Sequence, residues 1–218
     1  MVWVQKQKWW LLLNLVAAGI LAVVVTQGST DFSAETFDPL LASGKWGFRF
    51  LLLSLAMTPL NRYFGWREAI RLRKPAGLWA FGFTAVHFLY YLIEYQLNRF
   101  VWPVQLFIFL GILAFVVLLA MAVTSNKRSM RRLKQNWKRL HCLVYLAGIL
   151  VGLHAVLATF GSKRISVREP DVLPELIVYG VLLLILLALR LPQAWRLWQK
   201  MRASFWQRPF ATNVGKNQ

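Results

Sequence analysis

Six apolar stretches of membrane-spanning length alternate with basic or polar segments along this 218-residue chain. A helix needs about 20 mostly apolar residues to cross about 30 Å of hydrocarbon, and only helices and closed barrels satisfy their backbone groups in lipid. The six stretches are 9–26, 46–63, 76–95, 104–124, 140–160 and 174–191. The segments between them are too short for a second folded unit. The sequence therefore predicts an all-α integral membrane protein, a single bundle of six transmembrane helices.

The two ends of the chain extend this prediction. Lys6 and Lys8 precede the first stretch as in a signal peptide, but its apolar run is longer than such peptides use and no A-x-A site follows, so we expect a retained helix. Segment 192–218 is basic, and its apolar residues recur at a spacing of three or four. They are Trp195, Trp198, Met201 and Phe205. This spacing predicts a cytoplasmic amphipathic helix at the membrane surface.

The charge of the chain is distributed unevenly between the two sides of the predicted bundle. The 26 Lys+Arg and 8 Asp+Glu give a net charge of +18. An even number of spans places both termini on one side, and that side carries 20 of the basic residues, in segments 1–8, 62–74, 125–139 and 190–218. The positive-inside rule then places both termini in the cytoplasm. This basic face either determines the topology of the chain and attracts anionic lipid headgroups, or it docks a soluble protein or an anionic cofactor. Nucleic-acid binding is not indicated.

The sequence lacks the residues and motifs that several common kinds of chemistry require. The single cysteine, Cys142, excludes an internal disulfide and any multi-cysteine metal centre within the chain. No dinucleotide fingerprint, phosphate-binding loop or serine-nucleophile elbow occurs, so nicotinamide or ATP chemistry would need another polypeptide. Gly148 and Gly152 in the fifth stretch, and Gly77 and Gly82 in the third, indicate close helix packing or space for a flat cofactor.

The three histidines are His87, His141 and His154, and all lie within predicted spans. Ionisable residues inside a membrane are costly and usually serve proton paths, substrate sites or metals, although a hydrogen-bonded structural role is the alternative. A proton relay would recruit Asp or Glu, which the spans almost lack. Haem ligation needs only two facing neutral imidazoles in an apolar slot.

Depth in the membrane decides which histidines can form a pair. At 1.5 Å per residue, His87 and His154 lie about 17 and 21 Å from the cytoplasmic starts of their helices, so they can share one iron. His141 lies about 20 Å below His154, where the third helix offers Arg73 and no histidine. On a straight helix His141 and His154 point about 140° apart unless the helix bends, for instance near Gly148 and Gly152. His141 is therefore the less certain metal ligand.

Three motifs carry a resemblance to a known family. They are T-P-L-x-R-Y at 58–63, R-x-R-K-x-x-G-L-W at 71–79 with His87 beyond it, and W-x-x-L-H-x-x-V-Y-L at 137–146 with a second histidine 13 residues after the first. Together with the six-span layout, they resemble the ferric-reductase-type transmembrane family, with a core at about 46–191. Within it, the closest resemblance is to the haem-binding membrane subunits of bacterial methionine-sulfoxide reductase systems.

The resemblance implies a b-type haem and an FMN. It also implies electron transfer outward across the bacterial inner membrane to a periplasmic, molybdenum-containing subunit that reduces methionine sulfoxide in oxidised proteins. It implies quinol or a cytoplasmic flavin reductase as electron donor. By position, His87 and His154 match the outer haem pair and His141 the inner histidine. Broader relatives carry a histidine where this chain has Arg73, as well as a fused flavin domain that this sequence lacks. Arg73 then either binds a haem propionate or a flavin phosphate, or acts as one of the basic loop residues that determine topology.

We therefore expect an electron-transfer subunit without a substrate-transforming site of its own. Two alternatives remain at this point. One is a self-contained ferric or quinone reductase, which would turn over without a partner. The other is a cofactor-free transporter or scaffold, which would be colourless when pure.

Overall fold

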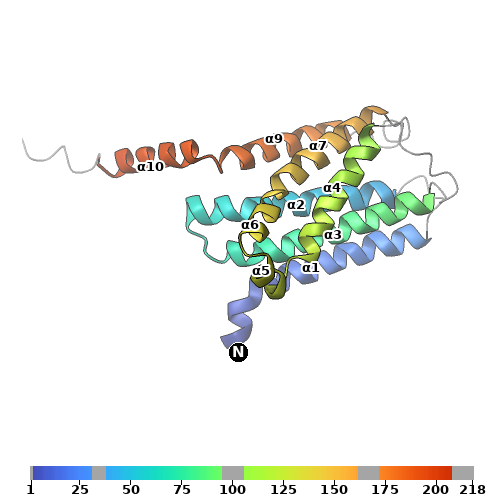
Figure 1. Ribbon diagram of the computed structural model, residues 1–218, viewed down its shortest axis with the longest axis horizontal. Helices are drawn as coiled ribbons and strands as arrows, with labels where there is room; N and C mark the ends of the chain where they lie inside the picture. Colours follow the sequence, from blue (N-terminus) through green and yellow to red (C-terminus); the bar gives the residue numbers. More distant parts are fainter. Residues whose placement is uncertain (1, 31–37, 95–105, 162–171, 208–218) are drawn as a thin grey trace, which may run out of the picture.

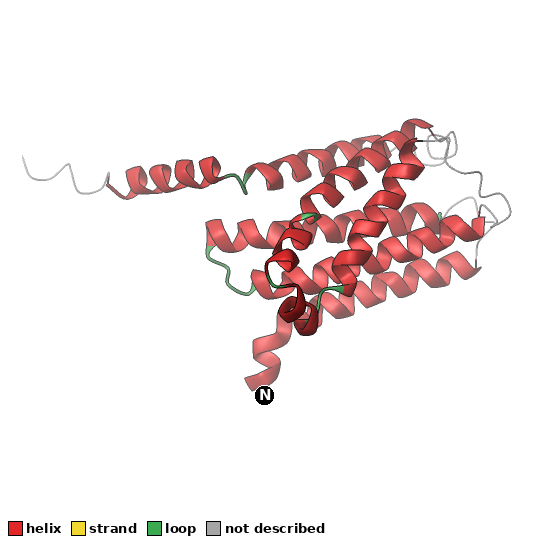
Figure 2. Cartoon of the chain, in the orientation of Figure 1, coloured by secondary structure: helices red, strands yellow, loops and turns green. Residues whose placement is uncertain are grey.

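The computed structural model describes residues 2–30, 38–94, 106–161 and 172–207 (Figure 1). Helices and the turns between them account for these ranges, and no strand occurs in them (Figure 2). The helices are α1 (Val2–Thr30), α2 (Pro39–Phe64), α3 (Ala69–Glu94), α4 (Leu106–Val123), α5 (Lys127–Leu133), α6 (Gln135–Cys142), α7 (Val144–Gly161), α9 (Val172–Ala188) and α10 (Pro192–Gln207). The predicted all-α class is confirmed.

Five predicted spans correspond to long apolar helices in the described ranges. These candidate spans are Gln7–Gln27, Pro39–Phe64, Ala69–Ile93, Leu106–Val123 and Gln135–Phe160. The sixth predicted span coincides with α9, which qualifies only together with α10, and the two helices are bent by 78° relative to each other. The bundle thus holds five spans, or six when this bent pair is counted as one.

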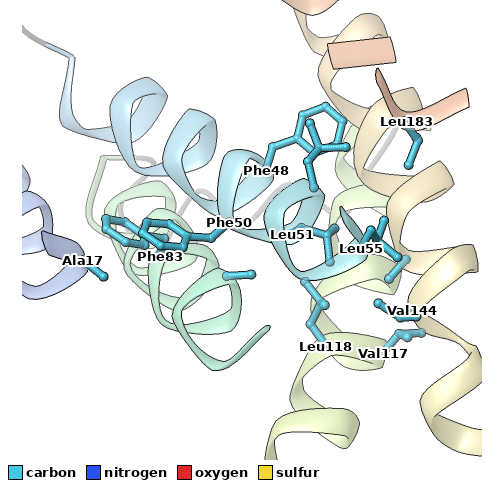
Figure 3. Packing of buried hydrophobic residues seen from close by; sticks show 13 residues of the cluster. Ala17, Phe48, Phe50, Leu51, Leu55, Phe83, Val117, Leu118, Val144 and Leu183 are labelled. Carbon is cyan, nitrogen blue, oxygen red and sulfur yellow. The ribbon is translucent and has the colours of Figure 1, made fainter. Parts of the chain in front are cut away.

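Helix α2 passes through the middle of the bundle and supplies five of the 13 buried residues of the main core cluster, more than any other helix (Figure 3). On one side Phe50 stacks on Phe83 of α3, with ring centroids 5.3 Å apart. On the other side Leu51 and Leu55 face α4, α7 and α9, where Leu183 packs (Figure 3). The helix has defined ends, because the Asp38 side chain accepts a bond from the Leu41 amide (3.0 Å) and Gly65 closes the last turn at φ 71°.

Helix α3 begins at Ala69, inside the segment 62–74 that we predicted as a loop. Ala69, Leu72 and Ala76 are all buried, and Ala69 and Leu72 cluster with Met57 of α2. Their spacing of three and four places them on one helix face, so the helix extends into the basic segment and leaves Arg71 exposed. It does so despite Pro75, which removes one backbone hydrogen bond.

The fifth span is interrupted at Leu143, between α6 and α7. We expected any bend near Gly148 and Gly152, and both lie within α7. A Cβ at Gly148 would lie 3.1 Å from Leu183 Cδ1, and one at Gly152 would lie 3.6 Å from Leu183 Cδ2. These two glycines therefore let α9 approach α7, which confirms the helix-packing interpretation. Segment 125–139, also predicted as a loop, forms α5 and part of α6.

The predicted helix in segment 192–218 is present as α10. Trp195 and Trp198 both pack edge-on against Tyr63 at the end of α2, with centroids 5.5 and 5.7 Å away. Met201 is 58% exposed, and the side chain of Phe205 lies outside the described set. Half of the predicted apolar stripe therefore anchors α10 to the bundle.

Candidate functional site

His87 of α3 and His154 of α7 face each other across one cavity. Their ring centroids are 6.1 Å apart and the ring planes are inclined by 84°. The cavity, called the histidine cavity below, is lined by both rings and by residues of α2, α3, α4, α7 and α9. Most of the lining is apolar, and it includes Phe48, Phe88 and Phe115. The structure thus brings together the two histidines that the depth argument paired.

Each imidazole is held by a backbone carbonyl of a neighbouring helix. His87 Nδ1 lies 2.8 Å from the Leu40 carbonyl oxygen near the start of α2, and His154 Nδ1 lies 2.7 Å from that of Phe107 near the start of α4. A carbonyl has two lone pairs, so it accepts this bond in addition to a helical one. A neutral imidazole that donates Nδ1–H keeps a lone pair on Nε2, which is the arrangement of metal-ligating histidines.

The spacing of His87 and His154 fits a metal whose remaining ligands come from a cofactor. With a metal–nitrogen bond of about 2.0 Å on each side, two imidazoles on opposite sides of one metal have ring centroids about 6.3 Å apart. The observed 6.1 Å agrees with this value. Within the described residues no group of three or more His, Cys, Asp or Glu side chains could hold a metal ion. Two imidazoles in an apolar slot therefore suit the axial positions of a haem, whose porphyrin supplies the other four ligands.

One edge of the histidine cavity is charged. Lys45 of α2 and Glu175 and Tyr179 of α9 line it. The Glu175 carboxylate accepts bonds from the Arg49 guanidinium and the Tyr179 hydroxyl, and Lys45 Nζ lies 3.1 Å from it. Arg49 Nε also donates to the Tyr179 hydroxyl (2.6 Å). This cluster joins α2 to α9 beside the cavity.

His141 and Arg73 lie elsewhere and do not line the histidine cavity. The His141 ring packs on Trp137 with centroids 4.0 Å apart, and His141 Nε2 lies 3.4 Å from Thr124 Oγ1 at the end of α4. Trp137 Nε1 donates to the Thr124 carbonyl (3.0 Å). Arg73 is close enough to interact electrostatically with His141 and with Arg190. These groups form a separate, positively charged region toward the α5–α6 end of the bundle.

Residues 43–152 of the chain match the family described as the ferric reductase like transmembrane component. A relative from Xanthomonas euvesicatoria pv. vesicatoria, named protein-methionine-sulfoxide reductase heme-binding subunit MsrQ, is 37% identical over 191 residues. That alignment covers 82% of this chain and 78% of the relative.

The chain belongs to the MsrQ family. Two further members carry the same name. One, from Xanthomonas oryzae pv. oryzae, is 37% identical over 169 residues, covering 74% of this chain and 69% of the relative. The other, from Xanthomonas campestris pv. campestris, is 36% identical over 186 residues, covering 81% and 77%. No solved structure matches the chain. Membership of this family agrees with the resemblance seen in the three motifs.

Two features of the site were missed in the sequence. The carbonyls of Leu40 and Phe107 have no signature, because every residue has a carbonyl group. The cluster around Glu175 has only a weak one. Lys45, Arg49 and Glu175 stand out as isolated charges in or beside apolar stretches, but their pairing depends on how α2 and α9 pack.

Removing the charge of Glu175 should loosen the contact between α2 and α9. Glu175→Gln leaves Lys45 and Arg49 without their shared carboxylate. Breaking these ion pairs from one side costs about 1–2 kcal/mol, less than for fully buried pairs, since the side chains of Lys45, Glu175 and Arg49 are 20%, 24% and 34% exposed. For a chain of this size that is a fall in Tm of about 3–6 °C. Thermal unfolding in detergent measures it, with Glu68→Gln at the other end of the bundle as control. Equal Tm values for the two variants would contradict the expectation.

Proposed function

We propose that this chain is a haem b membrane subunit that transfers electrons and transforms no substrate itself. The proposal is carried by one observation, the meeting of His87 and His154 across an apolar cavity with each Nδ1 bonded to a carbonyl. The family supports it, since its members named above are heme-binding subunits by name. When bound, the haem supplies one-electron chemistry, because its iron alternates between ferric and ferrous states.

Three features of the site favour electron transfer. His87 and His154 would hold the haem iron from both sides, so the site would suit electron transfer and not the binding of oxygen. The carbonyls of Leu40 and Phe107 orient the two rings and raise their basicity as ligands. Phe48, Phe88 and Phe115 line the cavity and exclude water, which lowers the reorganisation that accompanies a change of charge.

The position of the histidines and the distribution of charge support the proposed outward direction of transfer. His87 lies seven residues before the end of α3 and His154 seven before the end of α7, so both lie near one end of the bundle. The basic residues gather toward the opposite end. We propose that both termini are cytoplasmic, that the membrane is the bacterial inner membrane and that electrons leave on the periplasmic side.

The partner proposed for this chain is the catalytic subunit of a protein-methionine-sulfoxide reductase, because the relatives are named as subunits of that system. In this proposal the partner is periplasmic and contains molybdenum, and the electrons support repair of oxidised periplasmic proteins. Quinol or a cytoplasmic flavin reductase supplies them. His141 has a smaller part, since its ring already packs on Trp137 and lies outside the histidine cavity.

We propose FMN as a second cofactor, held near Arg73. The support is electrostatic. Arg73 lies close enough to Arg190 for the two positive charges to repel each other. Segment 62–74, which contains Arg73, holds five basic residues and one acidic residue, so this region favours a phosphate or carboxylate group.

Replacing Arg73 should lower the amount of bound flavin. Arg73→Gln is expected to reduce FMN per chain several-fold and to leave the haem content unchanged, whereas Arg71→Gln, an exposed residue of the same helix, should change neither. Fluorescence of flavin released by acid measures the content. Equal flavin in both variants, or none in the natural chain, would contradict this assignment.

Labelling of single cysteines tests the orientation. In a Cys142→Ser background, Lys163→Cys introduces a thiol in the segment of sequence that connects α7 to α9, and Lys216→Cys introduces one near the C-terminus. A membrane-impermeant maleimide should label Lys163→Cys in intact spheroplasts, and it should label Lys216→Cys only after the membrane is opened. The reverse pattern would show that the bundle is inverted.

Loss of either axial histidine should abolish haem loading. We expect purified natural protein to show a reducible b-type spectrum, and His87→Ala and His154→Ala to lose nearly all of it because one of only two protein ligands is removed. His141→Ala is the matched control and should retain most of the haem. Haem per chain is measured by absorbance after extraction, with folding checked by thermal unfolding. Full haem content in both alanine variants would refute the proposed function.

A further inference from the structure

The two halves of the histidine cavity repeat one arrangement at a fixed interval along the chain. His87 is bonded to a carbonyl 47 residues earlier, and so is His154. The interval between corresponding points is 67 residues, from Pro39 to Leu106 at the starts of α2 and α4 and from Glu94 to Gly161 at the ends of α3 and α7. The pairs α2–α3 and α4–α7 thus present their histidines in the same way.

Each half contains a glycine against the ring of its histidine. A Cβ built at Gly44 would lie 2.9 Å from Nδ1 and 3.1 Å from Cε1 of His87. A Cβ built at Gly111 would lie 2.8 Å from Nδ1 and 2.9 Å from Cε1 of His154. Contacts under 3.0 Å are essentially never seen for a real Cβ. Both histidine rings therefore occupy space that any other residue at these positions would fill.

The glycines are placed so that the rings cannot easily yield. Gly44 follows Leu40 by four residues, and Gly111 follows Phe107 by four, so each glycine lies one helical turn beyond the carbonyl that binds the same ring. The Nδ1–Cε1 edge of each imidazole is thus bonded to one turn and rests on the next. A methyl group on the glycine would push the ring away from its carbonyl, and the bond that orients Nε2 would lengthen or break.

We propose that Gly44 and Gly111 are positioning residues for the two axial histidines, one in each half of the site. This rests on the proposed function, since it assigns the glycines to haem ligation. Other glycines in the described part of the chain meet different groups: Gly47 faces Thr84, Gly77 faces Ser54 and Gly148 faces Leu183. Those contacts serve helix packing, although Gly47 also lines the histidine cavity, whereas the contacts of Gly44 and Gly111 set the position of a ligand.

Five single glycine variants, with carbon monoxide as a probe, test the proposal. CO binds ferrous haem only where an axial position opens, so it reports displacement of a histidine. Gly44→Ala and Gly111→Ala should each bind haem about tenfold more weakly and give a CO difference spectrum. Gly82→Ala and Gly180→Ala, where a Cβ would meet nothing within 4 Å, should behave as the natural chain and give none. Gly148→Ala would place a methyl group against Leu183, and neither residue lines the histidine cavity. This variant should therefore change Tm and leave the CO response unchanged.

Each outcome bears on a different claim. Full haem content and no CO response in both Gly44→Ala and Gly111→Ala would overturn the role of the glycines while leaving the haem assignment intact. A natural chain without haem would instead refute the proposed function. If either alanine variant fails to accumulate, Gly44→Ala/His87→Ala and Gly111→Ala/His154→Ala decide the matter. Removing the imidazole makes room for the methyl, so accumulation should return, and its failure to return would overturn the proposal.

Discussion

The hydrogen bond between each half-buried imidazole and a carbonyl of the adjacent helix is the contact on which this site depends. An imidazole N–H left without a partner in an apolar bundle would cost about 1–3 kcal/mol. Because Leu40 and Phe107 lie at the starts of α2 and α4, the bond also fixes where each of these helices stands relative to α3 or α7. Ring orientation and helix register are therefore set by one interaction, made once in each half of the bundle.

Polar contacts at its two ends hold α9 in the bundle. Near its start Glu175 meets Arg49 and Lys45 of α2, and just beyond its end Arg190 donates to the Tyr145 hydroxyl and to the Leu55 carbonyl (2.6 Å). Between them, small residues such as Gly148 let Leu183 approach α7. Lipid tails are as apolar as these side chains, so close packing and hydrogen bonds, more than burial, decide where such a helix sits.

The sequence was sufficient for the spans and for the pairing of His87 with His154, because both follow from apolar length and depth along a helix. It was insufficient where tertiary packing decides. The start of α3 at Ala69 depends on Ala69 and Leu72 packing on α2, and the break at Leu143 has no proline or glycine to mark it. The carbonyls of Leu40 and Phe107 could not be singled out, since an acceptor on the backbone leaves no trace in residue type.

The bend between α9 and α10 has a consequence for distance. With α9 across the bilayer, a turn of 78° directs α10 nearly parallel to the membrane surface, and Trp195 and Trp198 fasten it to the end of α2 through Tyr63. A helix lying in the headgroup layer resists movement of the bundle along the membrane normal. In the proposed arrangement, the depth of the histidine cavity, and with it the length of the electron's path to the far surface, is thus set by an element at the opposite face of the membrane.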